Sequence, residues 1–293
     1  MDLVIIGAGP AGLSAALYAN TFGIECIVLD NPEQLPQLSL APEVTNFPGF
    51  ESITGMELLS TFKKQVKKLG IKIIEEKVTD IKGMTVVTDS DKYDAKAILI
   101  ATGAKHRKAD IIGESEFLGK GVSYCGMCDG PLFKGKDVIV YGGGDTALKT
   151  AVFLQGLGCK VSVVHRRNEF RAAKENIDKA KKAGIKFILE RTIKEIAGSK
   201  LVEKVILDND KEVKCQGVFI AIGEVPAVEL VKKLGVKINE SNFIIVDSEQ
   251  RTNVKGVYAA GDVTNTPMRQ IVTACGDGAR AIQSISKFLK GEK

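Results

Sequence analysis

Two cysteines three positions apart, Cys125 and Cys128, lie in the stretch YCGMCDG, and an acid, Asp129, directly follows the second. A C-x-x-C pair can supply half of a zinc site, form a short structural disulfide, or act as a redox-active dithiol. The pair alone does not distinguish these three chemistries. The rest of the chain has to decide between them.

The remaining residues disfavour zinc. A structural zinc ion normally takes four protein ligands, and the chain has no second C-x-x-C pair and only two histidines, His106 and His165, so no metal is expected. A purely structural disulfide is also disfavoured, because closing so short a loop removes little chain entropy. Redox exchange remains, in which one cysteine attacks a substrate disulfide and the other resolves the mixed disulfide.

The composition is that of a globular protein with two domains or one elaborate one, since the chain has 293 residues, 44% of them hydrophobic. A net charge of +5, with lysines and acids intermixed, indicates neither a nucleic-acid partner nor a membrane surface. The start lacks a signal-peptide pattern, and no apolar run reaches the roughly 18 residues of a membrane span. A cytoplasmic protein is expected, with Cys26, Cys159, Cys215 and Cys275 as small core residues.

The elements that position this chemistry begin at the first residues. The stretch DLVIIGAGPAGLSAALYA predicts a buried strand, a glycine turn and a helix, and ECIVLD predicts a second strand that closes with Asp30. Gly7, Gly9 and Gly12 form G-x-G-x-x-G, which places a pyrophosphate on the helix N-terminus. Asp30 then falls where a carboxylate accepts hydrogen bonds from ribose hydroxyls.

The same pattern recurs at residues 137–167, as the strand DVIVY, a glycine turn, the helix TALKTAVFLQGLG and the strand KVSVVHRR. At the ribose position this second copy has His165, Arg166 and Arg167, with Arg171 one turn further on. Guanidinium groups bind a 2′-phosphate that a carboxylate would repel. The first site is therefore predicted to hold an adenosine with a free 2′-hydroxyl, and the second an adenosine 2′-phosphate.

Three further short strands end alike, in AILIATGA, GVFIAIGE and GVYAAGDV, where an apolar run reaches a glycine with small or polar neighbours. Such an ending is typical of a strand that meets a ligand closely. In the third, Asp262 is a candidate partner for a sugar-like chain of hydroxyls. Because this third strand fits the first nucleotide unit yet follows the second, the simplest topology inserts the second domain into the first.

Taken in order, GAGPAGLSAALYA, EVTNFPGF, ILIATGA, GVSYCGMCDG, VIVYGGGDTAL, HRRNEFRA, GVFIAIG and YAAGDVTNTPMRQIVTACGDGARA resemble the low-molecular-weight thioredoxin reductase family of FAD-dependent pyridine nucleotide-disulfide oxidoreductases. The resemblance implies an α/β fold of two Rossmann-like, three-layer ββα dinucleotide-binding domains. The FAD domain would comprise residues 1–107 and 228–293. The inserted NAD(P)H domain, residues 108–227, would carry the redox C-x-x-C.

The resemblance, with the motifs above, also implies the residues that contact each cofactor. The expected FAD contacts are Gly7, Gly9, Gly12, Asp30, Gln37, Asn46, Ala101, Thr102, Gly103, Asp262, Arg269, Gln270 and Ile271, and the expected NADPH contacts are Gly142, Gly144, Asp145, Thr146, His165, Arg166, Arg167, Arg171, Ile222 and Gly223.

The implied reaction passes hydride from NADPH to FAD, then electrons to a Cys125–Cys128 disulfide, then reducing equivalents to thioredoxin or a thioredoxin-like protein. Cys128 matches the family cysteine that interacts with the flavin, Cys125 is the expected attacker, and Asp129 the expected general acid. The family also implies a homodimer. It further implies rotation of one domain against the other, through crossings near residues 106–112 and 224–229.

Three departures from the family pattern concern the electron donor. Leu35-Pro36 replaces a glycine pair beside the flavin, Asp145 replaces the usual asparagine, and Lys149-Thr150 stands where glutamates are usual. One alternative is therefore the same flavin and dithiol chemistry with NADH, ferredoxin or a deazaflavin as donor. Another is a flavin-binding redox sensor without turnover.

Overall fold

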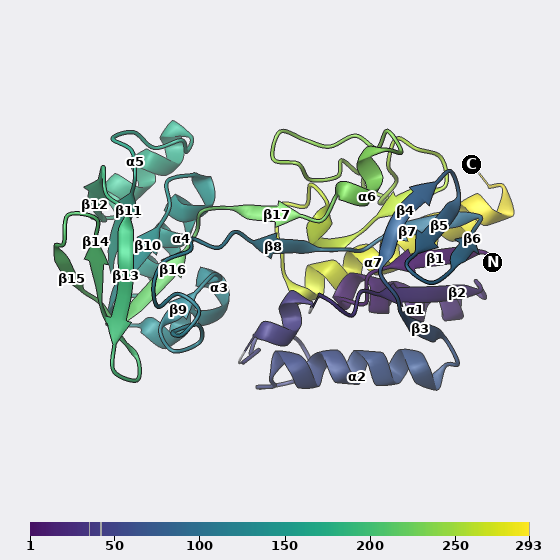
Figure 1. Cartoon of the computed structure of the whole chain (residues 1–293), viewed down its shortest axis with the longest axis horizontal. Coiled ribbons are helices and arrows are strands. Elements are labelled where there is room, and N and C mark those ends of the chain that lie inside the picture. The colour runs from purple at the N-terminus through teal and green to yellow at the C-terminus, as the bar shows by residue number, and fades with distance from the viewer. Residues whose placement is uncertain (35, 42, 293) are drawn as a thin grey trace. The chain divides into compact units, whose positions relative to one another are not determined.

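The computed structural model describes residues 1–34, 36–41 and 43–292, so Leu35 lies outside the described residues. The chain divides into two compact units: unit 1 consists of Met1–Lys105 and Val225–Lys293, and unit 2 of His106–Glu224. Each unit contains a five-stranded parallel sheet and a three-stranded antiparallel sheet. Figure 1 labels most of the helices and strands of both units.

The parallel sheet of unit 1 has the strand order β18-β7-β1-β2-β3. Its strands are β1 (Leu3–Ile6), β2 (Cys26–Asp30), β3 (Lys72–Glu75), β7 (Ala97–Ile100) and β18 (Val257–Ala259). Strand β18 pairs in parallel with β7, Val257 opposite Ile98. The prediction that GVYAAGDV belongs to the first nucleotide unit is confirmed, because this strand completes the sheet that begins at Leu3.

Alternate side chains of β1 point into two different cores, as the two-residue period of a strand requires. Leu3 and Ile5 pack in the core that the helices cover, whereas Val4 and Ile6 pack in the core on the side of the small antiparallel sheet. The helices are α1 (Pro10–Thr21), α2 (Gly55–Lys68) and α7 (Ile271–Lys290), and the small sheet is β4 (Val78–Lys82), β5 (Thr85–Thr88) and β6 (Lys92–Asp94). Unit 1 is thus three layers thick, with the parallel sheet in the middle.

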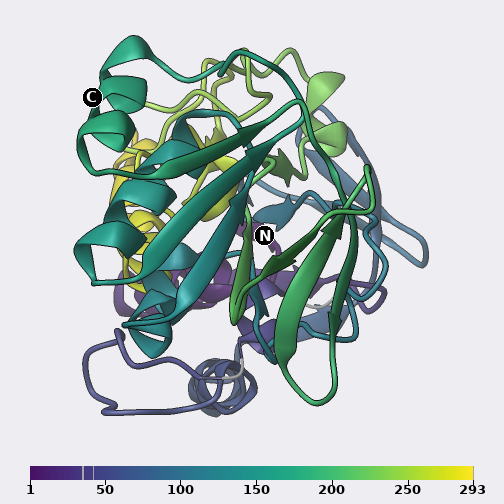
Figure 2. The ribbon, with the colours of Figure 1, turned by 90° about the vertical axis from the view of Figure 1, so that its left-hand side faces the viewer.

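The parallel sheet of unit 2 has the order β12-β11-β10-β16-β9. Its strands are β9 (Val122–Ser123), β10 (Asp137–Tyr141), β11 (Lys160–His165), β12 (Lys186–Leu189) and β16 (Gly217–Ile220). Helices α4 (Asp145–Gly156) and α5 (Lys174–Lys182) cover one face, and β13 (Ile193–Gly198), β14 (Val202–Leu207) and β15 (Glu212–Lys214) the other. Figure 2 views this unit with the sheet between the two outer layers.

The predicted carboxyl end of one strand of unit 2 was wrong. The run KVSVVHRR predicts a strand through both arginines, but β11 ends at His165. Arg166 and Arg167 follow it in a bend and are exposed, because strand pairing with β12 stops at His165. The arginines therefore stand beyond the carboxyl edge of the sheet, where ligands of α/β folds bind.

Short elements complete both units. These are η1 (Gln37–Leu40), α3 (Gly126–Asp129), η2 (Gly130–Phe133), α6 (Glu229–Lys232) and η3 (Gly261–Val263), together with β8 (Ala104–His106) and β17 (Glu224–Pro226). Strands β8 and β17 pair as a two-stranded sheet where the chain passes from one unit to the other.

The isolated cysteines are packed as expected: Cys26, Cys159 and Cys215 are buried, and Cys275 is partly buried. Burial raises the pKa of Cys26 to about 11 and that of Cys215 to about 12. Within the described part of the chain, no helix is long and apolar enough to cross a membrane.

Candidate active site

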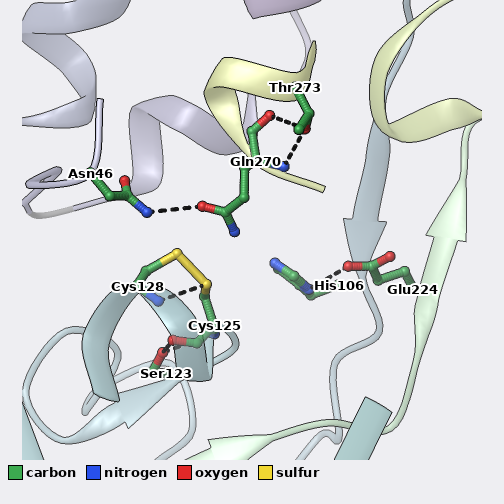
Figure 3. The surroundings of a disulfide bond; sticks show 8 residues. All are labelled: Asn46, His106, Ser123, Cys125, Cys128, Glu224, Gln270 and Thr273. Carbon is green, nitrogen blue, oxygen red and sulfur yellow. Dashed lines mark hydrogen bonds and ion pairs between the residues drawn. A yellow bond between two sulfur atoms is a disulfide. The ribbon is translucent and has the colours of Figure 1, made fainter. Parts of the chain in front are cut away.

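The dithiol of unit 2 is a disulfide in the structure. Cys125 and Cys128 are joined with their Cα atoms 5.3 Å apart, at the start of α3 (Figure 3). The backbone N–H of Cys128 donates to Sγ of Cys125 over 3.1 Å. Ser123 accepts a 2.9 Å hydrogen bond from the N–H of Cys125 through its hydroxyl oxygen. The sulfur of Cys125 is thus held next to a backbone donor, which stabilises a thiolate at that position.

Helix α3 lies close against α4 because the first of the two residues between the cysteines is a glycine, Gly126. A Cβ at Gly126 would overlap the methyl group of Thr150. Thr150, one of the positions where this chain departs from the family pattern, therefore forms part of the surface that supports the dithiol. Lys149, the other member of that pair, is exposed.

Asp129 ends α3 directly after Cys128 and is partly buried. Its backbone N–H donates to the carbonyl oxygen of Cys125 over 3.1 Å. This bond closes the single turn that carries both cysteines, so the carboxyl group of Asp129 is fixed on the same short helix as the two sulfur atoms.

A histidine lies beside the dithiol, and the sequence alone gave it no role. The ring of His106 stacks on that of Tyr124, the residue before Cys125, with centroids 5.1 Å apart and planes 2° from parallel. Nδ1 of His106 lies 3.7 Å from a carboxylate oxygen of Glu224 (Figure 3). Burial lowers the pKa of His106, and the charge of Glu224 acts in the opposite direction. No local motif marks this residue, because its partners are distant in sequence.

The glycine turn of unit 1 has the geometry of a phosphate cradle. A Cβ at Gly7 would overlap the backbone of Ala101 at the end of β7, so only glycine permits this approach. The position of a Cβ on Gly9 faces open space, with no heavy atom within 4 Å. Helix α1 begins at Pro10, and no described side chain caps it. Its first N–H groups therefore remain available to an anion, and the residues fit a dinucleotide.

The other residues expected at FAD gather around the carboxyl edge of the same sheet. Thr102 donates to the carbonyl oxygen of Ala227 over 2.9 Å, after β7 and before Gly103. Gln270 caps α7 ahead of Ile271, and its Oε1 accepts a 3.0 Å hydrogen bond from Asn46. Gln37 begins the single turn η1.

Two charged residues of this edge already have partners in the protein. Asp30, at the end of β2, forms a 2.6 Å ion pair with Lys63 from α2. Arg269 donates to the carbonyl oxygens of Asp262 and Thr264 over 3.3 and 3.2 Å, and its guanidinium lies over the ring of Phe243. Arg269 thereby fixes the backbone of the turn η3 that carries Asp262.

The glycine turn of unit 2 repeats this arrangement. The Cβ position of Gly144, which precedes α4, faces open space, and Thr146 is exposed in the first turn. A Cβ at Gly142 would overlap the backbone of Ala221 at the end of β16, just before Ile222 and Gly223. The second turn therefore also fits a pyrophosphate.

The ring of His165 packs against the glycine turn of unit 2. It is only 6% exposed, and a Cβ at Gly143 would overlap its ring. Its Nε2 hydrogen-bonds the carbonyl oxygen of Glu169 over 3.1 Å, and its ring stacks on Phe170. Burial lowers the pKa of His165, and the neighbouring arginines add to this effect. His165 is thus a buried side chain that packs against the glycine turn.

The three arginines beyond β11 are available to a ligand. Arg166, Arg167 and Arg171 are exposed, and no ion pair between described residues involves any of them. The N–H of Arg171 donates to the carbonyl oxygen of Gly143 over 2.9 Å. The glycine turn and the segment carrying the arginines are therefore tied together, which places positive charge next to the phosphate cradle.

The carboxylate of Asp145 is engaged by the protein. Its Oδ1 accepts hydrogen bonds from the side chain of Asn176 over 2.5 Å and from the N–H of Ala173 over 2.8 Å. These bonds hold the pKa of Asp145 below its usual value. The side chain of Asp145 thus binds to the segment that begins α5.

Among the described residues, no group of three or more His, Cys, Asp or Glu side chains is arranged to hold a metal ion.

Comparison with known proteins gives one consistent result. Residues 1–278 match the family model described as pyridine nucleotide-disulphide oxidoreductase. The chain is 40% identical, over a 302-residue alignment covering 99% of it and 94% of the relative, to a thioredoxin reductase of Listeria monocytogenes. A thioredoxin reductase of Bacillus subtilis is 37% identical, with 99% and 95% of the two chains covered.

Solved structures agree with these matches. The thioredoxin reductase from Giardia duodenalis superposes with a TM-score of 0.95 at 33% identity, covering 99% of this chain and 98% of that one. The thioredoxin reductase from Streptococcus pyogenes superposes with a TM-score of 0.90 at 36% identity, with the same coverage. The chain therefore belongs to the pyridine nucleotide-disulphide oxidoreductase family and, within it, to the low-molecular-weight thioredoxin reductases.

Proposed function

We propose that the protein reduces thioredoxin or a thioredoxin-like protein with electrons from NADPH, which pass through FAD and the Cys125–Cys128 disulfide. The observation that carries this proposal is the disulfide itself. It lies on a short helix of a nucleotide-binding fold, in a chain that matches thioredoxin reductases along its whole length.

Unit 1 is the proposed FAD domain. The open cradle at Gly9 and the uncapped start of α1 support a pyrophosphate there. Asp30 would meet the ribose, with Lys63 holding its carboxylate in place. Asp262, on the turn fixed by Arg269, and the pair of Asn46 and Gln270 are the proposed contacts to the rest of the cofactor. Bound FAD supplies the redox centre that accepts a hydride and passes two electrons on.

Unit 2 is the proposed NADPH domain. Gly144 and Thr146 at the start of α4 would hold the pyrophosphate. Arg166, Arg167 and Arg171 would bind the 2′-phosphate with charge-assisted hydrogen bonds. The carboxylate of Asp145 is turned to Asn176 and Ala173, which weakens the case for a donor other than NADPH.

Once the disulfide is reduced, the chain's own residues carry out the exchange. The Cys125 thiolate, held beside the N–H of Cys128, attacks one sulfur of the partner's disulfide and forms a mixed disulfide. The partner's leaving thiolate takes a proton from Asp129. The Cys128 thiolate then attacks Sγ of Cys125, re-forms the internal disulfide and releases the partner's second sulfur, which is also protonated. One dithiol is oxidised and one disulfide is reduced.

Anaerobic titration of the yellow, FAD-loaded protein with NADPH, NADH, and reduced ferredoxin or deazaflavin tests the donor. NADPH is expected to bleach the flavin at the lowest concentration. Equal bleaching by NADPH and NADH would contradict the 2′-phosphate assignment. Bleaching only by ferredoxin or the deazaflavin would favour the alternative donor.

A second assay tests the transfer of electrons from the dithiol to thioredoxin. It measures NADPH-dependent reduction of thioredoxin through the reduction of insulin or of a disulfide dye. Cys128→Ser is expected to lose this activity while NADPH still bleaches its flavin. Wild-type protein that bleaches but does not turn over would point to the redox sensor instead. The proposed homodimer is a separate matter, measured by sedimentation of the FAD-loaded protein.

A further inference from the structure

Four side chains form a continuous cluster on the amino-terminal side of the dithiol. The cluster begins with Glu224 of β17, which lies next to His106. His106 stacks on Tyr124, and Tyr124 donates a hydrogen bond to Glu114, in the segment after β8. Tyr124 is the residue immediately before Cys125. The exchange chemistry described above uses none of the four.

Tyr124 is fixed at two points. Its hydroxyl donates to the carboxylate of Glu114, and its ring is covered by His106. Glu114 is only 3% exposed and also accepts hydrogen bonds, each 3.1 Å long, from the N–H groups of Ala109 and Ile111. Because Glu114 is anchored to backbone, the hydroxyl of Tyr124 has a rigid partner. The side chain of Tyr124 also packs against the core cluster that includes Val122, and the stacked ring of His106 adds a further contact.

The charges around His106 come from each element packed against it. Glu224 faces it from β17, the phenol of Tyr124 faces it from the segment before α3, and Glu114 lies behind that phenol. Lys105 and Arg107 flank it on its own segment. A protonated His106 would gain a charged pair with Glu224 and a cation–π contact with Tyr124, both stronger than the contacts of the neutral ring.

We propose that His106 is a positioning residue for Cys125: its ring clamps Tyr124, and the clamp holds Cys125 where the N–H of residue 128 stabilises the thiolate. The proposal rests on the proposed function in taking Cys125 as the attacking sulfur. Protonation of His106 tightens the clamp. A looser Tyr124 lets the Cys125 segment move, the hydrogen bond to Sγ is lost for part of the time, and the thiol pKa of Cys125 rises.

The test measures Cys125 directly. In FAD-loaded protein carrying Cys128→Ser, the rate of alkylation of Cys125 by iodoacetamide is followed from pH 5 to 9 by peptide mass spectrometry. The backbone N–H of residue 128 remains in this variant. The other cysteines react slowly, because burial raises the pKa of each one, to about 11 for Cys275.

His106→Ala in this background is expected to slow alkylation at pH 7 by about tenfold, as for the loss of one hydrogen bond to a charged group. His106→Phe keeps a stacking ring without a titratable group. It should restore the rate at pH 7 to within about twofold and remove the histidine ionisation from the pH profile below pH 7. The control Lys105→Ala, one residue away and exposed, should leave the rate at pH 7 unchanged, because it removes no contact to Tyr124.

Two results would overturn the proposal. One is a His106→Ala rate equal to the parent rate across the whole pH range. The other is a His106→Phe rate as slow as that of His106→Ala, since stacking would then not be the cause. Neither measurement uses nucleotide or thioredoxin, so an error in the proposed donor or partner would leave these outcomes unchanged.

Discussion

Unit 1 and unit 2 share one order of four strands, β7-β1-β2-β3 and β16-β10-β11-β12, around the same kind of glycine turn, and they differ at the end of the second of these strands in the chain, β2 and β11. In unit 1 this place holds Asp30, neutralised by Lys63. In unit 2 it holds Arg166 and Arg167, both exposed. The backbone of both glycine turns fits a phosphate, and in the proposed function the residues at the end of the strand determine which adenosine binds there.

The two turns also differ in how closely helix and strand approach. The third motif position is Gly12 in unit 1 and Ala147 in unit 2. A Cβ at Gly12 would overlap the carbonyl oxygen of Gly7, whereas the methyl group of Ala147 is fully buried in the core of unit 2. The third position of the motif therefore accommodates a methyl group in unit 2 but not in unit 1.

Exchanging these two residues is the strongest test of the comparison. Gly12→Ala is expected to destabilise the protein by about 3 kcal/mol or more, because the new methyl group meets backbone that cannot yield. It should also displace the start of α1 and reduce FAD content. Ala147→Gly should cost only about 1–2 kcal/mol and leave FAD content unchanged. Thermal unfolding and the flavin-to-protein absorbance ratio measure both effects. Full FAD content in Gly12→Ala would show that the two turns do not differ in tightness.

The double substitution Arg166→Ala with Arg167→Ala tests the difference in charge between the ends of β2 and β11. The KM for NADPH should rise about 100-fold, for the loss of two charged hydrogen bonds, while the KM for NADH changes little. The matched control is Arg191→Ala, an arginine of the same unit that pairs with Asp208; it should change neither value. Steady-state kinetics with both nucleotides measure this preference. An equal rise for both nucleotides would mean that the arginines do not recognise the 2′-phosphate.

The smallest effect concerns Asp145, which has no counterpart in unit 1. Asp145→Ala should cost about 1 kcal/mol, as for loss of a helix cap on an exposed surface, and Asp145→Asn less. Because the pKa of Asp145 in the folded protein lies below the unfolded value of 3.8, the contribution is complete only when the pH is well above that unfolded value, and it disappears as the pH falls through the folded pKa. Urea unfolding at pH 3 and pH 7 checks this. An Asp145→Asn protein with the parent's pH dependence would contradict it.

The strands and helices around both glycine turns were predictable because their signals are local. An unbroken apolar run such as LVII, followed by glycines and a second apolar stretch, reports a strand buried on both faces and the helix beside it. The order of motifs along the chain also placed β18 in the first sheet, and the pairing of Val257 with Ile98 confirms it.

The remaining features depend on partners far apart in the chain. Asp145 meets Asn176, and His106 meets Glu224, across segments that no motif connects. Lys63 gives no sign in the sequence that it would reach Asp30. The second β layer of each unit was implied only by the family resemblance and not by its own residues, since the strands of the small antiparallel sheets are short and partly exposed and lack a strong periodic pattern.

The late arrival of β18 has a consequence for synthesis. The sheet of unit 1 begins with the first strand made but needs Val257–Ala259 at its edge, after all of unit 2 has been translated. Unit 2 is one continuous segment and can fold as soon as it leaves the ribosome. Unit 1 therefore cannot complete its sheet until after unit 2 has been synthesised. Until then one edge of β7 is unpaired in the nascent chain, and another strand could pair with it.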